Sequence, residues 1–434
     1  MTMQHRRSAE LEATLVDLAR GPYPEYIDDV LARTARSRQR PAWTFPERWL
    51  PMFGIASEQA LAPRFPLRAI AIALIVIALL VATVVALIAG AQPRIPAPFG
   101  VADNGLIAFE RGGDIYTADP ATGVQTAILT GSQTDVGPRF SLDGTRILFE
   151  RKLDYFHSQL YLARSDGTGL TLLTPEPLTL AAGDLGRAWE KYQLSPDGRT
   201  VLMATETSGV HTITIAQADG TGVRRLDVGM SASEPSFRPP NGAEILFIGE
   251  GDQGLGLFAV NIATETVRQI QLIPNGFGVA GPSWSPDGSH IAYWMWDETA
   301  NGLTARTHVV WADGTGDREL PSPPGAVWNA HATWSNDGNR IFIARAYTPG
   351  YDDVRGAVVP ADGSDFGVEV APASVETNCC AAWMWSPDDT KLLGRTSPIT
   401  GTPDKLVIID VATRTVSSVP WTSTSDPTWQ RLTP

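Results

Sequence analysis

One pattern of apolar and polar positions occurs seven times in the last two thirds of the chain, and we call it the repeated phrase. A full copy has an apolar or aromatic residue, usually then Ser, a turn that is Asp-Gly or Asn-Gly except for Asp388-Asp389, and a short apolar, often β-branched run. The copies begin at Phe140, Leu194, Phe237, Trp284, Trp334, Trp385 and, in truncated form, Trp429. They return about every 48 residues, which is the period of a four-stranded propeller blade and not that of a helical repeat.

The turn residues predict a hairpin in each copy. In Ser285-Pro286-Asp287-Gly288, Pro sets φ near −65° for a turn, Asp bonds its own backbone, and Gly takes the left-handed position. A second turn, such as the Ala-Asp-Gly-Thr-Gly that starts at Ala312, follows about 25 residues later. Two hairpins per repeat give four antiparallel strands.

The ends of the repeated region complement each other. The strand at Leu106 to Phe109 has no phrase before it, whereas the phrase at Trp429 has no strand after it. We expect the C-terminal strand to complete the first blade, because this removes an open sheet edge. The prediction is an all-β fold, a seven-bladed β-propeller of four-stranded antiparallel blades over residues 105–434.

The Trp-Ser-Pro-Asp-Gly turn at Trp284, the strand "IAYW" at Ile291 and the "DIYTAD" at Asp114 together resemble a known repeat. They are similar to the WD40-like (PD40) repeats of the bacterial TolB propeller, which prolyl oligopeptidases also contain. The resemblance covers about residues 101–434. It implies a β-propeller that acts mainly in protein binding.

A second feature is the uncharged, almost wholly apolar segment from Ala69 to Ala89. Its 21 residues would form a helix long enough for the roughly 30 Å hydrocarbon core. A signal peptide fits less well, because the segment begins far from Met1 and is too long. A buried core helix would need a helical partner that the β-rich remainder lacks. We therefore expect a single transmembrane helix over residues 69–89, with residues 90–104 as a linker.

Basic residues near this segment set its expected orientation. Arg48, Arg64 and Arg68 precede it closely and only Arg94 follows closely. By the positive-inside rule, the N-terminus is cytoplasmic and the propeller is extracytoplasmic, at the cell membrane. The formal net charge of the chain is −13 although residues 1–68 hold ten Arg and eight acidic residues. The outer domain is therefore acidic, and we expect no nucleic acid partner.

Residues 1–68 are too few for a large core. Periodic apolar positions near Leu11 and Ile27 predict two short amphipathic helices, and a Pro- and Trp-rich juxtamembrane segment follows them. The region resembles the N-terminal parts of single-pass anti-sigma regulators but lacks the His/Cys zinc motif. A cytoplasmic transcription partner of residues 1–68 is thus an alternative function.

Motifs for catalysis or metal binding are missing from the sequence. It has no G-x-S-x-G elbow, H-E-x-x-H motif, P-loop or calcium loop, and its six His are scattered. We expect no metal, no cofactor and no catalytic residue. Cys379 and Cys380 are adjacent, so they form either two buried thiols, which we favour, or a strained vicinal disulfide.

The loops that lead into each first strand, and those between second and third strands, lie on one face of a propeller. There they combine aromatic and acidic residues, as recognition surfaces do. Trp284, Trp334 and Trp385 belong to the repeated phrase and are interpreted as packing residues, whereas of Trp294 and Trp296 one is expected to face solvent. The candidate residues for ligand or partner binding are Tyr155, His157, Glu190, Glu234, Trp296, Trp328, His331, Tyr351 and Asp426.

Three classes of function fit these observations. The first is a membrane-anchored binding or sensing protein whose propeller holds a protein, peptide or glycan without catalysis. The second is the transmembrane regulator with a cytoplasmic partner. The third is a propeller hydrolase or lyase that uses carboxylates such as Glu190, Glu234 and Asp426. The first ranks highest, because acid–base catalysis needs positioned pairs and the sequence shows only scattered acids.

Overall fold

The computed structural model describes residues 99–180, 191–299, 302–348, 353–371, 378–397 and 405–432. These residues belong to one compact unit, Ala91–Pro434. The expected N-terminal helices, the expected transmembrane segment at residues 69–89, Glu190 and Tyr351 lie outside the described residues. Within the described ranges, no helix is long and apolar enough to cross a membrane.

The described residues form antiparallel β-sheets, which confirms the all-β prediction. Five sheets have four strands and one has eight. In chain order the first fourteen strands are β1 (Asp103–Arg111), β2 (Asp114–Ala118), β3 (Gln125–Leu129), β4 (Thr134–Phe140), β5 (Arg146–Lys152), β6 (Ser158–Arg164), β7 (Thr171–Leu172), β8 (Tyr192–Leu194), β9 (Thr200–Thr207), β10 (Val210–Gln217), β11 (Arg224–Leu226), β12 (Ala232–Phe237), β13 (Glu244–Gly251) and β14 (Gly254–Asn261). The other fourteen are β15 (Val267–Leu272), β16 (Gly278–Trp284), β17 (His290–Thr299), β18 (Gly302–Trp311), β19 (Arg318–Glu319), β20 (Trp328–Trp334), β21 (Arg340–Ala346), β22 (Val354–Pro360), β23 (Val368–Ala371), β24 (Asn378–Trp385), β25 (Lys391–Ser397), β26 (Lys405–Asp410), β27 (Val416–Ser418) and β28 (Thr428–Leu432).

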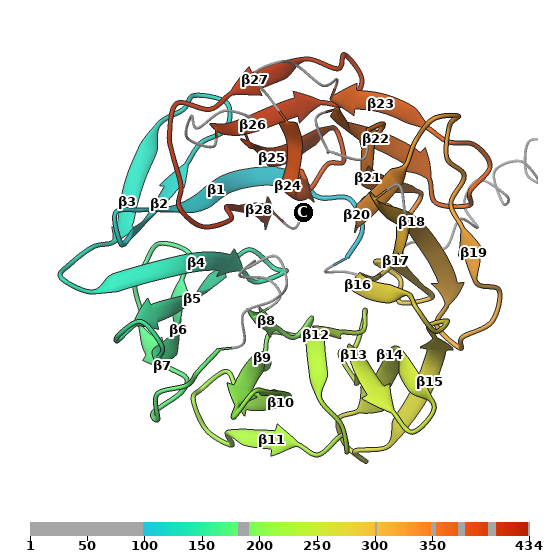
Figure 1. Cartoon of the computed structure of the whole chain (residues 1–434). Helices are drawn as coiled ribbons and strands as arrows, with labels where there is room; N and C mark the ends of the chain where they lie inside the picture. Colours follow the sequence, from blue (N-terminus) through green and yellow to red (C-terminus); the bar gives the residue numbers. More distant parts are fainter. Residues whose placement is uncertain are drawn as a thin grey trace, which may run out of the picture. The chain divides into compact units, whose positions relative to one another are not determined.

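The sheets stand in a ring around a common centre, as in a β-propeller (Figure 1). The innermost strands are β28, β4, β8, β12, β16, β20 and β24, and the following strands of each group lie progressively further out (Figure 1). Six of the named inner strands end at the aromatic or apolar residue of a repeated phrase, and in β28 the corresponding Trp429 is the second residue. The phrase therefore marks the start of every group of four strands, as the sequence predicts.

The last strand joins the first group. β28 pairs with β1 in antiparallel register, with Trp429 opposite Ile107, and the sheet order is β28-β1-β2-β3. Trp429 is buried with Phe109 and Trp421 in a cluster that also contains Leu393 of the preceding group. The expected closure by the C-terminal strand is confirmed.

The eight-stranded sheet differs from the prediction of separate four-stranded blades. The group β16–β19 and the group β20–β23 are joined by one parallel pair, Ala305 with Trp328. Small and apolar residues make this approach possible, since Ala280, Ala330 and Ala344 pack around the same place. The joint is a single bridge between two groups that each keep their own antiparallel ladder.

A repeated hydrogen-bond pattern explains why each phrase turns. In the copy at Trp284, the Ser285 hydroxyl donates to Asp287 Oδ1 at 2.5 Å and accepts from the amide of His290 at 2.9 Å. The amide of Gly288, at φ 70°, donates to the Ser285 carbonyl. The same contacts between the hydroxyl of the Ser and the carboxylate two residues later recur at Ser141, Ser195, Ser335 and Ser386.

The tryptophans of the phrase are packing residues, as expected. Trp284 and Trp385 are buried, and Trp334 packs against a neighbouring core cluster. Trp334 Nε1 donates to the carbonyl of Ser283 at 3.2 Å, and Trp385 Nε1 to that of Thr333 at 3.0 Å. Each of these indoles thereby fastens its inner strand to the preceding one.

Candidate functional site

The two ends of the ring carry different kinds of connection. Turns from the first to the second strand and from the third to the fourth lie at one end, called the turn end here. Connections from the second to the third strand, and into the next inner strand, lie at the opposite end, called the loop end. The candidate binding residues that the structure describes belong to the loop end or to the inner strands beside it; they are Tyr155, His157, Glu234, Trp296, Trp328, His331 and Asp426.

Several inner strands contain a β-bulge three residues before the aromatic residue of the repeated phrase. The register of β4, β12, β16 and β20 with the next strand shifts at this point. The residues there have φ in the left-handed region: Gly137 at 61°, Glu234 at 50°, Gly281 at 60° and His331 at 58°. Glycine adopts this conformation freely, but Glu and His do so at a cost of about 1–3 kcal/mol each, a strain that often marks functional positions.

Glu234 connects two of these bulges. Its Oε2 accepts a hydrogen bond of 2.7 Å from the amide of Gly281 in the next inner strand. A similar contact joins the Ser425 hydroxyl to the amide of Gly137, at 3.2 Å. Glu234 is only 8% exposed, so its carboxylate first of all satisfies a backbone donor of the neighbouring group.

Beside His331 lies a cluster of three tryptophans. The His331 ring centroid is 5.3 Å from that of Trp294 and 5.1 Å from that of Trp328, and Trp294 is 5.0 Å from Trp296. Trp294 and Trp328 are both buried, and Trp296 packs against the same core cluster. The expectation that Trp294 and Trp296 face opposite sides is wrong, because residues two apart in a strand share a face. Trp328, which the sequence offered as a surface anchor, contributes to the core.

Among the described residues of the loop end, the most exposed aromatic side chains lie between β5 and β6. Tyr155 is 89% and Phe156 67% exposed, and their rings contact each other edge to face at 5.0 Å. Asp154 holds this turn in place, since its Oδ1 accepts from the amides of Phe156 and His157 at 2.8 Å each. These hydrogen bonds and the imidazole of His157, 2.9 Å from Asp154 Oδ2, lower the pKa of Asp154, the His157 side chain most. We call residues 153–157 the aromatic tip.

Carboxylates near the loop end are engaged in defined pairs. Asp135 receives two hydrogen bonds from Arg151, at 2.7 and 2.8 Å. Glu150 accepts from the Ser158 hydroxyl at 2.5 Å and pairs with Lys152. Such charge-assisted pairs orient the carboxylates as structural groups.

Asp426 is the exception among these carboxylates. Its Oδ2 is buried and has no hydrogen-bond partner in the described part of the chain. Its charge helps to raise the pKa of the buried Tyr192, although burial of the phenol is the main cause. Tyr192 begins the inner strand β8, whereas Asp426 lies two residues before the inner strand β28 of a different group.

The remaining predicted residues are only partly placed. Cys379 and Cys380 belong to β24, but their side chains lie outside the described part, as do Glu190 and Tyr351 entirely. Among the described residues, no group of three or more His, Cys, Asp or Glu side chains could hold a metal ion.

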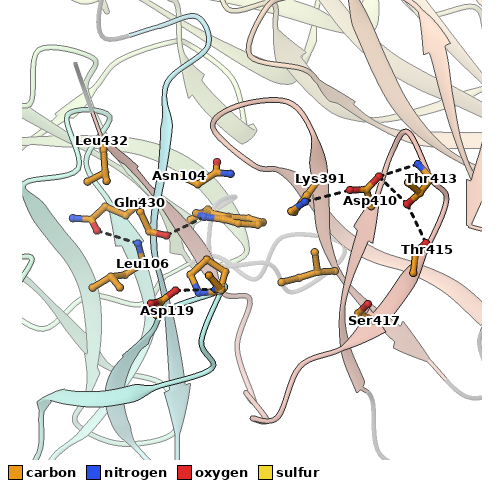
Figure 2. A pocket seen from close by; sticks show the side chains of 15 residues that line it. Asn104, Leu106, Asp119, Lys391, Asp410, Thr413, Thr415, Ser417, Gln430 and Leu432 are labelled. Carbon is orange, nitrogen blue, oxygen red and sulfur yellow. Dashed lines mark hydrogen bonds and ion pairs between the residues drawn. The ribbon is translucent and has the colours of Figure 1, made fainter.

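The turn end has a groove of about 850 Å³ where the last group meets the first (Figure 2). Several of its polar side chains already have partners: Lys391 Nζ lies 3.3 Å from Asp410 Oδ2, Asp119 caps its own turn, and Gln430 Oε1 accepts from the Leu106 amide (Figure 2). The groove exists because β28 and β1 are not joined by a turn. We interpret it as a gap in the closure and not as a binding site.

A smaller cavity of about 340 Å³ lies at the turn end of the ring centre. Arg139 and Arg431 supply the charged side chains of its lining. Arg431 is 8% exposed; it donates to Asn336 Oδ1 at 2.6 Å and to the carbonyl of Gly100, and the Asn336 amide group donates to Asp389 Oδ1 at 2.7 Å. These contacts join the C-terminal strand, two neighbouring turns and the start of the described chain.

Comparison with known proteins gives the fold and nothing finer. No family model and no curated protein sequence matches the chain. Among solved structures, the oligogalacturonate lyase of Vibrio parahaemolyticus has a TM-score of 0.53 at 16% identity and covers 73% of this chain and 86% of that one. A puromycin hydrolase has a TM-score of 0.52 at 18% identity, over 78% of this chain and 55% of the hydrolase. TolB from Acinetobacter baumannii has a TM-score of 0.45 at 15% identity, over 75% and 81% of the two chains.

Sequence reasoning found the aromatic tip but missed two features. The residue at the bulge is Gly, Glu or His in different strands, so no single residue type identifies the bulge in the sequence. Trp311 also escaped notice, although it stands at the end of β18, where β6 has Arg164 and β10 has Gln217. An aromatic residue in a position that is polar in other copies was the available signal.

Proposed function

We propose that this chain is a membrane-anchored binding protein, in which a closed seven-bladed propeller presents a recognition surface at its loop end. The segment at residues 69–89 would anchor it, with the propeller on the extracytoplasmic side. The ligand is a protein or peptide, and binding proceeds without catalysis. The aromatic tip carries this proposal.

The aromatic tip has the properties of a binding hot spot. Two large aromatic side chains, Tyr155 and Phe156, stand in solvent, and Leu153 beside them is 46% exposed. The Asp154 hydrogen bonds fix the turn before any partner arrives, so little conformational entropy is lost on binding. Exposed apolar groups in a fixed turn have no use in folding, but they are typical of protein interfaces.

The engaged carboxylates support binding over catalysis. Asp135 and Glu150 are held by Arg151, Ser158 and Lys152, so their oxygens are already engaged in contacts within the protein. An acid–base pair would need a carboxyl group whose pKa is tuned toward neutrality.

The test compares partner retention by the full chain and its variants. The purified chain is cross-linked to solubilised envelope proteins, and a recovered partner is then titrated by interferometry. Tyr155→Ala combined with Phe156→Ala should weaken its binding by about tenfold or more, since hot-spot truncation costs about 2 kcal/mol. Phe366→Ala is the matched control, because Phe366 is 48% exposed but lies at the turn end. Equal affinity of the tip variant and the wild type would refute the proposal.

A lyase or hydrolase is the second candidate, and the strained bulge residues favour it. Glu234 and His331 both have left-handed φ, as residues at active sites often do. One structurally similar protein is an oligogalacturonate lyase. Incubation with oligogalacturonate, followed by absorbance of the unsaturated product, tests this reading. If the chain cleaves oligogalacturonate and Glu234→Gln abolishes this activity, the enzymatic function would be preferred over the binding function.

A further inference from the structure

The seams between neighbouring groups at the turn end are usually closed by one side chain. It starts the second strand of a group or follows the aromatic residue of the first strand, and it donates to a turn carbonyl of the next group. The four examples are Gln430 to Gly144 at 2.7 Å, Arg146 to Gly198 at 2.7 Å, Arg238 to Gly288 at 3.0 Å and Arg340 to Asp389 at 3.0 Å.

The seam between β16–β19 and β20–β23 lacks this contact. The position that holds Arg146 in β5 and Arg340 in β21 holds His290 in β17. Its imidazole is too short to reach the next turn; Nδ1 lies 2.7 Å from the Ser289 hydroxyl and the ring lies against Trp311, centroids 3.8 Å apart. In the described part of the chain, the carbonyl of Gly338 in that next turn accepts no hydrogen bond from a side chain.

A groove of about 560 Å³ opens where the contact is missing. One wall is aromatic: Trp311 is 46% exposed, and the Trp334 ring centroid lies 6.5 Å from that of His290. The lining also carries polar groups on Asn339, Asp362 and Arg318, and Arg318 Nη2 donates to the Ala361 carbonyl at 2.7 Å. This volume lies within the range of about 300–1,000 Å³ that is usual for small-ligand sites.

We propose that this groove binds a neutral sugar ring, such as one residue of an oligosaccharide. A pyranose has an apolar face that stacks on Trp311 and a rim of hydroxyl groups that pair with the polar groups of the lining. The charges of Arg318 and Asp362 offset each other, which favours an uncharged ligand over an acidic one. Partial burial lowers the pKa of His290, so its imidazole is neutral at pH 7 and Nε2 remains available to a hydroxyl group.

The inference is independent of the aromatic tip. His290 and Asn339 lie at the turn end, whereas Tyr155 and Phe156 lie at the loop end. Binding of a protein partner at the loop end and binding of a sugar at the turn end can therefore be abolished separately. The variants below distinguish the two kinds of binding.

In the experiment, the purified full chain is titrated separately with maltotetraose, cellotetraose and chitotetraose, and the heat of binding is measured by calorimetry. At least one of the three should bind, and Trp311→Ala should weaken that binding by about tenfold. His290→Arg installs the side chain that closes other seams, so it should abolish binding while the melting temperature stays equal or rises. Tyr155→Ala at the loop end is the control and should bind the sugar as the wild type does.

Two results would overturn the inference. One is no heat of binding with any of the three sugars at millimolar concentration. The other is sugar binding that survives both Trp311→Ala and His290→Arg, which would place the sugar elsewhere on the chain.

Discussion

The carboxylate of Glu234 accepts a 2.7 Å hydrogen bond from the amide of Gly281, and both residues have left-handed φ, at 50° and 60°. The two bulges are therefore fixed to each other across a seam. A bulge leaves one backbone amide outside its ladder, and here the neighbouring group supplies the acceptor. The inner strands are thereby connected by side chains as well as by core packing.

Trp328 and Trp296 should differ in their contribution to stability. Trp328→Ala removes a buried ring from the cluster around Trp294 and should lower the free energy of unfolding by about 3–5 kcal/mol. Trp296 is only partly buried, so Trp296→Ala should cost less. Urea denaturation of both variants measures this. Equal and small losses would show that Trp328 is not a core residue.

The closure should depend on Trp429. Its indole is 4% exposed and Nε1 donates to the Gly105 carbonyl at 3.2 Å, so Trp429→Ala should cost about 3–5 kcal/mol and promote aggregation through the freed edge of β1. Leu432→Ala in the same strand is the control, because Leu432 is 44% exposed. Chemical denaturation and light scattering follow the two effects. A Trp429 variant as stable as the control would contradict the closure.

Glu244 should make stability depend on pH in the acid range. Hydrogen bonds from Arg268, and then from Arg238, lower its pKa from 4.5 to about 2 although burial opposes this. When the pKa of a carboxyl group is lower in the folded state than in the unfolded state, the ionised group stabilises the folded protein at pH values above the unfolded-state pKa. This stabilisation is lost as the pH falls from 4.5 toward 2.

Glu244→Gln should therefore lower stability at pH 7 by about 1–3 kcal/mol and make the loss between pH 4.5 and 2 smaller than in the wild type. Glu250→Gln, at an exposed position of the same strand β13, is the control and should leave the profile unchanged. Melting temperatures across this pH range give the measurement. A Glu244→Gln profile parallel to that of the wild type would show that the arginine pairs contribute nothing.

Membrane orientation remains a prediction, and a reporter fusion checks it. Alkaline phosphatase fused after Pro434 should be active, and green fluorescent protein at the same place should be dark, because the C-terminus is expected outside the cytoplasm. Removing residues 69–89 should reverse both signals. The opposite pattern in the intact chain would refute the orientation.

The two cysteines give a direct chemical test. We favour free thiols at Cys379 and Cys380, so the unfolded chain, kept non-reducing throughout, should take up two equivalents of an alkylating reagent, one for each Cys in the sequence. Mass spectrometry counts the adducts. No alkylation before reduction, and two adducts after it, would establish the vicinal disulfide instead.

The repeated phrase made the strands and the closure predictable, because the turn favours residues such as Ser285, Asp287 and Gly288, which return in most other copies. The bulges were not predictable, since Glu234 and His331 have no residue type in common. The groove beside Trp311 depends on His290 being too short to cross a seam. Such a gap appears only when the neighbouring group is in place. The burial of Trp328 likewise follows from the bridge to Ala305, which joins two consecutive groups of strands.

Arg431 affects how the chain before Gly100 would transmit force to the propeller. It holds the carbonyl of Gly100 and the side chain of Asn336, while its own strand β28 pairs with β1, which begins at Asp103. Tension on the chain before Gly100 is therefore divided between the β1 ladder and the guanidinium. A load applied along β1 would have to shear several hydrogen bonds of its two ladders together, whereas a load across the strand would break them one after another.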